Sequence, residues 1–186
     1  MLLLLDLDGV LADFELGFIT AWQAKFPDIP AVSFEERRHF HLLDDYPAAL
    51  REQGRTIYTS QGFIRNLPAV PGAVQAFHEL LQLDLDVRIC TSPLKHYEHN
   101  VLEKYEWVDR HLGRAATERM IVTRDKTLVR GDVLIDDRPT ISGAMTPTWR
   151  HIVFDAPYNR TVVDRPRMQW RNWRSVLAGE MYHADW

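Results

Sequence analysis

Two pairs of aspartates follow short apolar runs in this sequence of 186 residues. Asp6 and Asp8 end the first apolar run, and Asp136 and Asp137 end another one far downstream. Clustered carboxylates repel one another unless a cation or a proton relieves the charge. A hard divalent cation with oxygen ligands fits such a cluster, and Mg²⁺ commonly takes one or two carboxylates together with water and substrate phosphate. Taken alone, either pair is equally typical of an acidic turn at a strand end.

Hydroxyl and ammonium groups that could hold phosphate oxygens lie between the two pairs. Thr91 and Ser92 end a second apolar run, and Lys126 follows a third. Considered singly, Thr91 and Ser92 are typical of a turn, and Lys126 is typical of a solvated helix face. Phosphoryl transfer through a carboxylate requires a nucleophile, a proton donor for the leaving oxygen and positive groups around the phosphoryl. The residue types predict the first two roles for Asp6 and Asp8 and the third for Lys126.

The elements that must position these residues have the pattern of strands alternating with helices. Short apolar runs typical of strands buried on both faces lie at residues 2–5, 87–90, 120–122, 133–135 and 152–154. Helical faces are indicated by Val74, Phe77, Leu80 and Leu81, and, within residues 97–112, by Val101, Leu102, Tyr105, Val108 and Leu112. The alternation predicts an α/β fold with a doubly wound parallel sheet. Parallel strands would bring both aspartate pairs to one edge of that sheet.

The interval between the first two predicted strands is too long for a single crossover. It spans about 80 residues and contains helix-like and aromatic segments, whereas most connections are far shorter. We expect a small helical cap at residues 14–71, inserted into a core formed by residues 1–13 and 72–186. Because the insertion begins at the carboxyl end of the first strand, it would cover the edge where α/β sheets bind ligands.

Composition limits the class of protein and its partners. The formal net charge of −4 provides no basic stripe, so polymeric nucleic acid is not an expected partner. Cys90 is the only cysteine, which excludes a disulfide within one chain and fits a reducing compartment. The first apolar run is too short for a signal peptide, and no run reaches the roughly 20 apolar residues of a membrane helix. We expect a soluble cytoplasmic protein.

The ordered motifs resemble those of the haloacid dehalogenase-like (HAD) phosphatases. The segments that carry this resemblance are "DLDGVLAD", "TS", Lys126 and "DD". Over nearly the whole chain the sequence is similar to one branch, the 5'(3')-deoxyribonucleotidases. The segments similar to that branch include "RRHF", "YPAAL", "GFIRNLPAVPGA", "CTSPLKHYEHNVLEKYEWVDRHLG", "RMIVTRDKTLVRGDVLIDD" and "TPTWRHIVF". The resemblance implies a HAD-like core, a small helical cap, Mg²⁺ as cofactor and a deoxyribonucleoside monophosphate as substrate.

The resemblance also implies roles for individual residues. Asp6 would attack the phosphate, and Asp8 would protonate the leaving sugar oxygen and then activate water. Mg²⁺ would be held by the Asp6 side chain, the Asp8 backbone carbonyl and Asp136, with Asp137 beside the metal and orienting its waters. Phosphate oxygens would be held by Thr91, Ser92, Lys95 and Lys126, while Gly9 would let the backbone approach them closely.

Substrate choice would come from the cap and from one neighbouring loop. Phe14, Phe40 and Tyr46 match aromatic positions of the family's nucleoside pocket, although an aromatic residue in a small subdomain can equally belong to its core. An apolar wall at the sugar would favour a 2'-deoxy substrate, because it leaves a ribose hydroxyl without a partner. Arg124 would read the base edge. His41 departs from the pattern of at least one family member, which has a second aromatic residue beside the phenylalanine, and this leaves the base preference open.

Two alternative functions remain at this stage. One is a HAD phosphatase for another small phosphomonoester, and the other is a non-catalytic nucleotide-binding protein with the same fold. The second alternative would not require a proton donor at Asp8. The second acid and the metal pair also disfavour haloacid dehalogenation. The oligomeric state is not determined by the sequence, and a homodimer stays open.

Overall fold

A six-stranded parallel sheet forms the centre of the molecule in the computed structural model, which describes residues 1–95 and 98–182. The strands are β1 (Leu2–Leu5), β2 (Asp86–Thr91), β3 (Met120–Val122), β4 (Val133–Asp136), β5 (Arg150–Phe154) and β6 (Arg167–Met168). Their order is β3-β2-β1-β4-β5-β6, and every neighbouring pair is parallel. This order, which reverses direction at β1, is that of a doubly wound α/β sheet. The predicted fold class and all five predicted strands are confirmed, and β6 is an additional edge strand.

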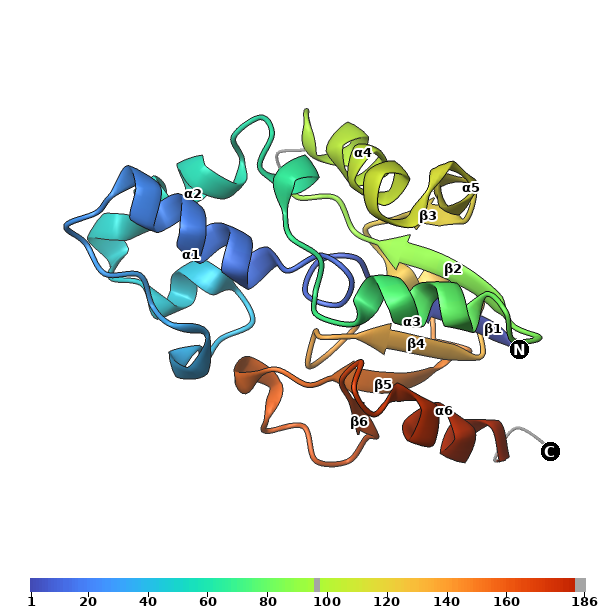
Figure 1. Ribbon diagram of the computed structural model, residues 1–186. Helices are drawn as coiled ribbons and strands as arrows, with labels where there is room; N and C mark the ends of the chain where they lie inside the picture. The colour runs from blue at the N-terminus through green and yellow to red at the C-terminus, as the bar shows by residue number, and fades with distance from the viewer. Residues whose placement is uncertain (96–97, 183–186) are drawn as a thin grey trace.

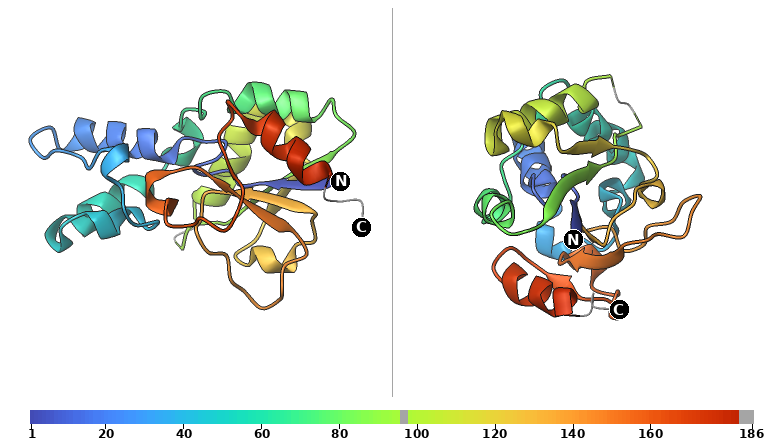
Figure 2. Two further views of the ribbon diagram at one scale, coloured as in Figure 1. Left: turned by 90° about the horizontal axis from the view of Figure 1, so that it is seen from below. Right: turned by 90° about the vertical axis from the view of Figure 1, so that its right-hand side faces the viewer.

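The helices are α1 (Phe14–Lys25), α2 (Arg51–Tyr58), α3 (Ala73–Leu80), α4 (Asn100–Leu112), α5 (Arg114–Thr117) and α6 (Trp173–Tyr182). Helices α1 and α2 extend beyond the carboxyl ends of the strands, whereas the other helices lie beside the sheet (Figures 1 and 2). Asp13 begins α1 as its N-cap, accepting a hydrogen bond from the Leu16 N–H at 2.9 Å. The central strands are fully buried, as Leu3 to Leu5 and Val133 to Ile135 show. Their continuous apolar sequence therefore reflects burial on both faces of the sheet.

One predicted helix is present, but the face that it buries differs from the predicted face. The helix predicted at residues 97–112 is α4, which begins at Asn100, and residue 97 lies outside the described residues. Leu102 and Tyr105 are 65% and 37% exposed, whereas Lys104 is fully buried. The prediction counted only apolar residues, but the buried face of α4 includes polar side chains that have partners inside the protein. That face comprises Asn100, Glu103, Lys104, Trp107, Val108 and Leu112.

The segment between β1 and α3 lies beyond the carboxyl ends of the strands (Figure 1). It contains α1, α2 and 3₁₀ turns at Phe34–Glu36, Leu42–Asp45, Ala48–Leu50 and Ile64–Asn66. Its two ends are held together by an antiparallel bridge between Ala12 and Ala69. The Asp13 N–H donates to the Pro68 carbonyl and the Val70 N–H to the Leu11 carbonyl, each at 2.8 Å. The segment therefore leaves and rejoins the sheet at one place.

A buried ion-pair network holds this inserted segment in shape. Arg37, which is 2% exposed, donates two hydrogen bonds of 3.0 Å to the carboxylate of Glu15 on α1. The same guanidinium also pairs with Asp45, which in turn contacts His39. Buried charges are tolerated only when they are paired in this way. Among the residues described, no helix combines the length and the apolar character needed to cross a membrane.

Candidate active site

A cavity of about 430 Å³ lies between the carboxyl ends of the strands and the inserted segment. The residues that the sequence predicts for catalysis, phosphate binding and metal binding all line it: Asp6, Asp8, Gly9, Thr91, Ser92, Lys95, Lys126, Asp136 and Asp137. Of the predicted substrate pocket, the lining includes Phe14, Phe40, His41 and Arg124. The strand order accounts for this convergence, because β2 and β4 are the two neighbours of β1.

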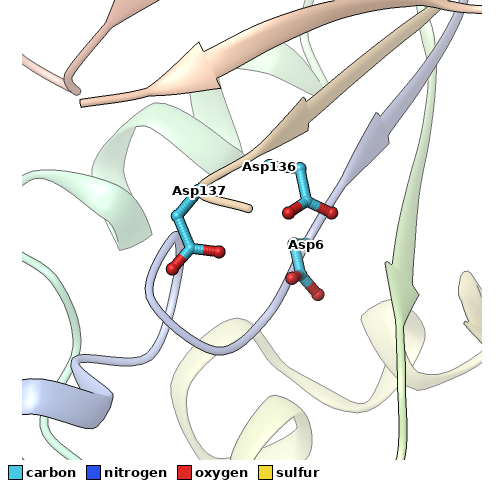
Figure 3. A group of neighbouring side chains, drawn as sticks. All are labelled: Asp6, Asp136 and Asp137. Carbon is cyan, nitrogen blue, oxygen red and sulfur yellow. The ribbon is translucent and has the colours of Figure 1, made fainter. Parts of the chain in front are cut away.

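Three of the carboxylates that line this cavity form an acidic cluster (Figure 3). Asp6 follows β1, while Asp136 ends the neighbouring β4 and Asp137 comes next in the chain. Each contributes one oxygen to a group in which these atoms all lie within 4.8 Å of one another. Asp136 and Asp137 are only 1% and 5% exposed. The register of β1 against β4, which pairs Leu5 with Ile135, places the two acidic strand ends side by side.

The cluster carries excess negative charge in a buried place. Burial raises the pKa of Asp136 to about 6. Burial, together with the charges of Asp136 and Asp6, raises the pKa of Asp137 well above its ordinary value. A divalent cation would relieve this repulsion, and carboxylate oxygens are the donors that Mg²⁺ prefers. The group of three carboxylates therefore fits a hard divalent cation.

Lys126 supplies positive charge beside the same cluster. Its Nζ lies 2.9 Å from Asp6 Oδ1 and 2.5 Å from Asp136 Oδ2. Burial alone would lower the pKa of this ammonium, but the charges of Asp136 and Asp6 outweigh burial and raise it above the ordinary lysine value. Lys126 thus stays charged and joins the two strand ends.

A short turn fixes the position of Lys126. The residue begins a 3₁₀ turn, Lys126–Leu128, whose N-cap Asp125 accepts hydrogen bonds from the Thr127 N–H at 2.9 Å and the Thr127 hydroxyl at 2.5 Å. Asp125 also accepts from the Ala144 N–H at 2.8 Å. On the other side, the Trp149 indole donates to the Lys126 carbonyl. These contacts order the backbone from which the ammonium reaches the cluster.

Two residues, Gly9 and Tyr158, surround the Oδ2 atom of Asp137. Gly9 has a φ of +81°, and a Cβ at this position would overlap Asp137 Oδ2 and lie 2.9 Å from its Cγ. Tyr158, in the 3₁₀ turn Pro157–Asn159, donates a hydrogen bond from its hydroxyl to Asp137 Oδ2. Sequence analysis did not identify Tyr158, because nothing in the local sequence distinguishes it from a packing tyrosine. Gly9 is required here both by its backbone conformation and by the carboxylate beside it.

Asp8 has a separate basic partner. The Lys104 ammonium on α4 donates to Asp8 Oδ2 at 2.6 Å and to the Thr91 hydroxyl at 3.0 Å. The pKa of Asp8 is raised, because burial outweighs the opposing effect of Lys104. Sequence analysis also missed Lys104, although its spacing of three residues from Val101 and four from Val108 places it on one helical face with them. A lysine that shares a helical face with apolar residues is the feature of the sequence that could have identified it.

Aromatic side chains from the inserted segment also line the cavity. The Phe14 ring packs against Tyr58 and Phe63, with ring centroids 6.1 and 5.3 Å apart. Tyr58 also lines the cavity and was not predicted. Phe40 lies between His41 and Tyr158, with centroid distances of 5.4 and 6.0 Å. The lining of the cavity therefore offers flat apolar surfaces.

The Arg138 guanidinium lies 5.2 Å above the Phe40 ring. Arg138 and Arg124 both line the cavity and are exposed. Arg124 donates to the Leu94 carbonyl at 3.4 Å. These two exposed arginines add to the positive charge that the buried Lys126 brings to the cavity lining.

Tyr46, which was predicted to line the substrate pocket, lies outside it. It is 3% exposed and does not line the cavity. Its ring packs against Trp22 and Phe18, with centroids 4.8 and 5.8 Å away, and its hydroxyl accepts a hydrogen bond from the Val32 N–H at 2.9 Å. The tyrosine therefore belongs to the core of the inserted segment, because its aromatic ring is enclosed by α1 rather than turned to the cavity.

The fold and the acidic sheet edge define an α/β protein with the HAD-like hydrolase fold. A HAD family hydrolase from Deinococcus radiodurans, solved with bound phosphate and sodium, superposes with a TM-score of 0.61 at 16% identity. The match covers 96% of this chain and 95% of that one. A haloacid dehalogenase-like hydrolase from Burkholderia xenovorans gives a TM-score of 0.51 at 15% identity, covering 97% of both chains. At these identities the similarity is one of fold.

Sequence comparison defines the family within this fold. The family model described as "5' nucleotidase, deoxy (Pyrimidine), cytosolic type C protein" matches residues 1–180, and the chain belongs to this family. A protein of Bordetella pertussis, named as an inferred 5'(3')-deoxyribonucleotidase, is 65% identical over 185 residues and all of both chains. The human cytosolic-type 5'(3')-deoxyribonucleotidase is 45% identical, over 94% of this chain and 92% of its own length. The family resemblance seen in the sequence is confirmed.

Proposed function

We propose that this protein is a Mg²⁺-dependent 5'(3')-deoxyribonucleotidase that hydrolyses deoxyribonucleoside monophosphates through an aspartyl-phosphate intermediate. The observation that carries the proposal is the arrangement of Asp6, Asp8 and Lys126 around one cavity. That arrangement occurs in a chain that belongs to a nucleotidase family. A non-catalytic binding protein would not need a nucleophile and a separately supported acid in one cavity.

The proposed reaction uses Asp6 and Asp8 in two steps. A carboxylate oxygen of Asp6 attacks the phosphorus, the bond to the sugar oxygen breaks, and Asp8 gives its proton to that oxygen. Asp8 then takes a proton from water, whose oxygen attacks the phosphorus and releases Asp6. The raised pKa of Asp8 supports its protonated state before the first step. Mg²⁺, held by Asp6, Asp136 and the Asp8 carbonyl with Asp137 beside it, would neutralise charge on the phosphoryl oxygens.

We assign phosphate recognition and nucleoside recognition to different residues of the cavity lining. The phosphate oxygens would be held by Thr91, Ser92, Lys95 and Lys126, which line the cavity together with the acidic cluster. The nucleoside would contact Phe14, Phe40 and His41, with Arg124 near the base edge. We treat residues 14–71 as the cap and residues 1–13 with 72–186 as the core. The cytosolic-type human relative supports a cytoplasmic location.

Phosphate release from a panel of deoxynucleoside and ribonucleoside 5'- and 3'-monophosphates, with and without Mg²⁺, tests the proposal. We expect release from the deoxynucleotides only with Mg²⁺, none with Asp6→Asn, and a loss of kcat of about 10² to 10⁴ with Asp8→Asn. Turnover by Asp6→Asn would refute the mechanism. A preference for sugar phosphates would refute the substrate and leave the chemistry standing.

A second candidate function is suggested by one residue of the pocket. His41 lines the cavity beside Phe40, at a position that sequence analysis identified as a departure from the family pattern. An imidazole offers hydrogen bonds where a larger aromatic ring offers only a stacking surface. The alternative is a HAD phosphatase for another small phosphomonoester, and the same panel extended to sugar phosphates separates the two functions.

A further inference from the structure

Lys104 is a fully buried lysine that the proposed reaction does not yet use. It extends from the middle of α4, and its side chain has no exposed surface. A lysine is almost never completely buried unless its charge is paired. Its ammonium is 2.6 Å from Asp8 Oδ2 and 3.0 Å from the Thr91 hydroxyl. Its contacts therefore lead to Asp8 and to the residue that ends β2.

The two oxygens of the Asp8 carboxylate are in different environments. Oδ2 is bound by the Lys104 ammonium. Oδ1 is buried and has no hydrogen-bond partner within residues 1–95 and 98–182. A buried oxygen without a partner is costly, so such an atom usually has a functional reason. An oxygen bound to an ammonium is the poorer proton carrier of the two, because the positive charge withdraws electron density from it.

We propose that Lys104 is a positioning residue that binds Asp8 Oδ2 and thereby leaves Oδ1 as the atom that exchanges the catalytic proton. The assignment rests on the proposed phosphatase function. In the first step the proton moves from Oδ1 to the sugar oxygen as the bond between that oxygen and phosphorus breaks. In the second step Oδ1 accepts a proton from the water that attacks phosphorus, and the Asp6 carboxylate leaves. Lys104 keeps its own protons throughout and fixes the rotation of the carboxylate.

The geometry also separates Lys104 from the other buried lysine. Lys126 contacts Asp6 and Asp136, whereas Lys104 contacts Asp8. Each of the two carboxylates assigned to chemistry therefore has its own ammonium. A change at Lys104 should alter proton transfer and leave the attack of Asp6 largely intact.

Two substrates that differ in their leaving group test this assignment. A deoxynucleoside is a poor leaving group and needs the proton, whereas p-nitrophenolate leaves without one. We expect Lys104→Met to lower kcat for deoxynucleoside monophosphates by about 10². The first turnover of p-nitrophenyl phosphate should slow by less than about fivefold, because it lacks the acid-catalysed step. The second step would still be slow, so a burst of p-nitrophenol equal to the enzyme concentration should precede a slow steady state.

Control variants separate positioning from stability and from phosphate binding. Glu103, the neighbour of Lys104 on α4, accepts hydrogen bonds from the Gly62 and Ile64 N–H groups and does not contact Asp8. Glu103→Gln should lower the melting temperature without producing a burst. Lys104→Arg, which keeps the charge and the donors, should recover part of the nucleotide turnover. If Lys104→Met is unfolded at the assay temperature, Lys104→Gln takes its place in the same comparison.

Three results would overturn the assignment. An unchanged nucleotide kcat in Lys104→Met would show that Asp8 needs no support from this residue. Equal slowing of nucleotide turnover and of the p-nitrophenol burst would show an effect on attack by Asp6. A parallel rise in KM for both substrates at constant kcat would make Lys104 a phosphate-binding group. Absence of phosphate release by the wild-type protein would instead refute the proposed function, and the two failures are therefore distinguishable.

Discussion

Gly9 lies so close to Asp137 that any side chain at position 9 would displace the Asp137 carboxylate. A Cβ there would overlap Asp137 Oδ2, and the backbone of Gly9 has a φ of +81°. The glycine that follows Asp6 and Asp8 in the sequence is thus in contact with the carboxylate that follows the neighbouring strand β4. The contact couples the loop after β1 to the proposed metal site.

Gly9→Ala should therefore damage the site as well as the backbone. The positive φ alone should cost roughly 1 to 2 kcal/mol of stability. Displacement of the Asp137 carboxylate should raise the Mg²⁺ concentration for half-maximal activity by about 10 to 100-fold. Gly113→Ala is the matched control, since Gly113 has a φ of +92° with open space around it. Similar losses of activity in both variants would contradict a specific role for the Gly9 contact.

Asp137→Asn should change how stability depends on pH in metal-free protein. Because the pKa of Asp137 is raised, the folded protein binds this proton more tightly than the unfolded chain does. Stability then falls as pH rises from about 4 through the raised pKa. Asp137→Asn lacks this loss and should melt at a higher temperature than wild type near pH 8, with the difference shrinking toward about pH 5. Thermal denaturation of the wild type and of Asp137→Asn in the presence of a chelator, repeated over this pH range, measures the difference in melting temperature. If the two curves of melting temperature against pH are parallel, the expectation is wrong.

Tyr158→Phe should weaken metal binding without disturbing the fold. The substitution removes the hydroxyl that donates to Asp137 and keeps the ring that packs against Phe34 and Phe40. Loss of such an outer hydrogen bond lowers metal affinity by about 10 to 100-fold. Calorimetric titration with Mg²⁺ measures the effect. Tyr105→Phe, which removes a hydroxyl from an exposed part of α4, should leave the affinity unchanged, and an equal decrease there would disprove the assignment.

Phe14→Leu and Tyr46→Phe should separate the cavity from the core. Phe14 lines the cavity, and loss of its aromatic surface should raise KM for deoxynucleotides roughly fivefold. KM for p-nitrophenyl phosphate should hardly change, because that substrate has no nucleoside. Tyr46→Phe removes the bond to the Val32 N–H and should cost about 1 kcal/mol of stability with KM unchanged. Nucleotide KM values that rise in Tyr46→Phe would restore the tyrosine to the pocket.

Most of the site could be predicted because its residues are tied to strand ends. Asp6, Asp136 and Thr91 each end or follow a strand whose apolar sequence is unmistakable, and parallel pairing brings strand ends together. Lys126 was identified for a similar reason, since it follows β3 closely. For these residues, local pattern and topology are sufficient.

The residues that sequence reasoning missed act across long separations in the chain. Lys104 lies 96 residues from Asp8 in the sequence. A helical face defined only by its apolar residues assigns a lysine to the solvent-exposed side. Tyr158 reaches Asp137 from a different loop. Tyr46 is the opposite case, a residue that was assigned to the pocket and lies outside it. Its match to an aromatic position of the family could not determine whether its ring faces the cavity or packs against α1. Side-chain direction in irregular segments depends on tertiary packing rather than on period.

The bridge between Ala12 and Ala69 has a consequence for how such proteins diversify. It joins the two ends of the inserted segment at its base. The chain therefore leaves the sheet and returns to it at nearly the same place, whatever the length of the segment between these ends. Segments of other lengths can be accommodated at such a junction without altering the register of the sheet, as domain insertions are at closely spaced termini. The bridge thus allows the segment that lines part of the cavity to change in length or sequence while the residues at the strand ends keep their positions.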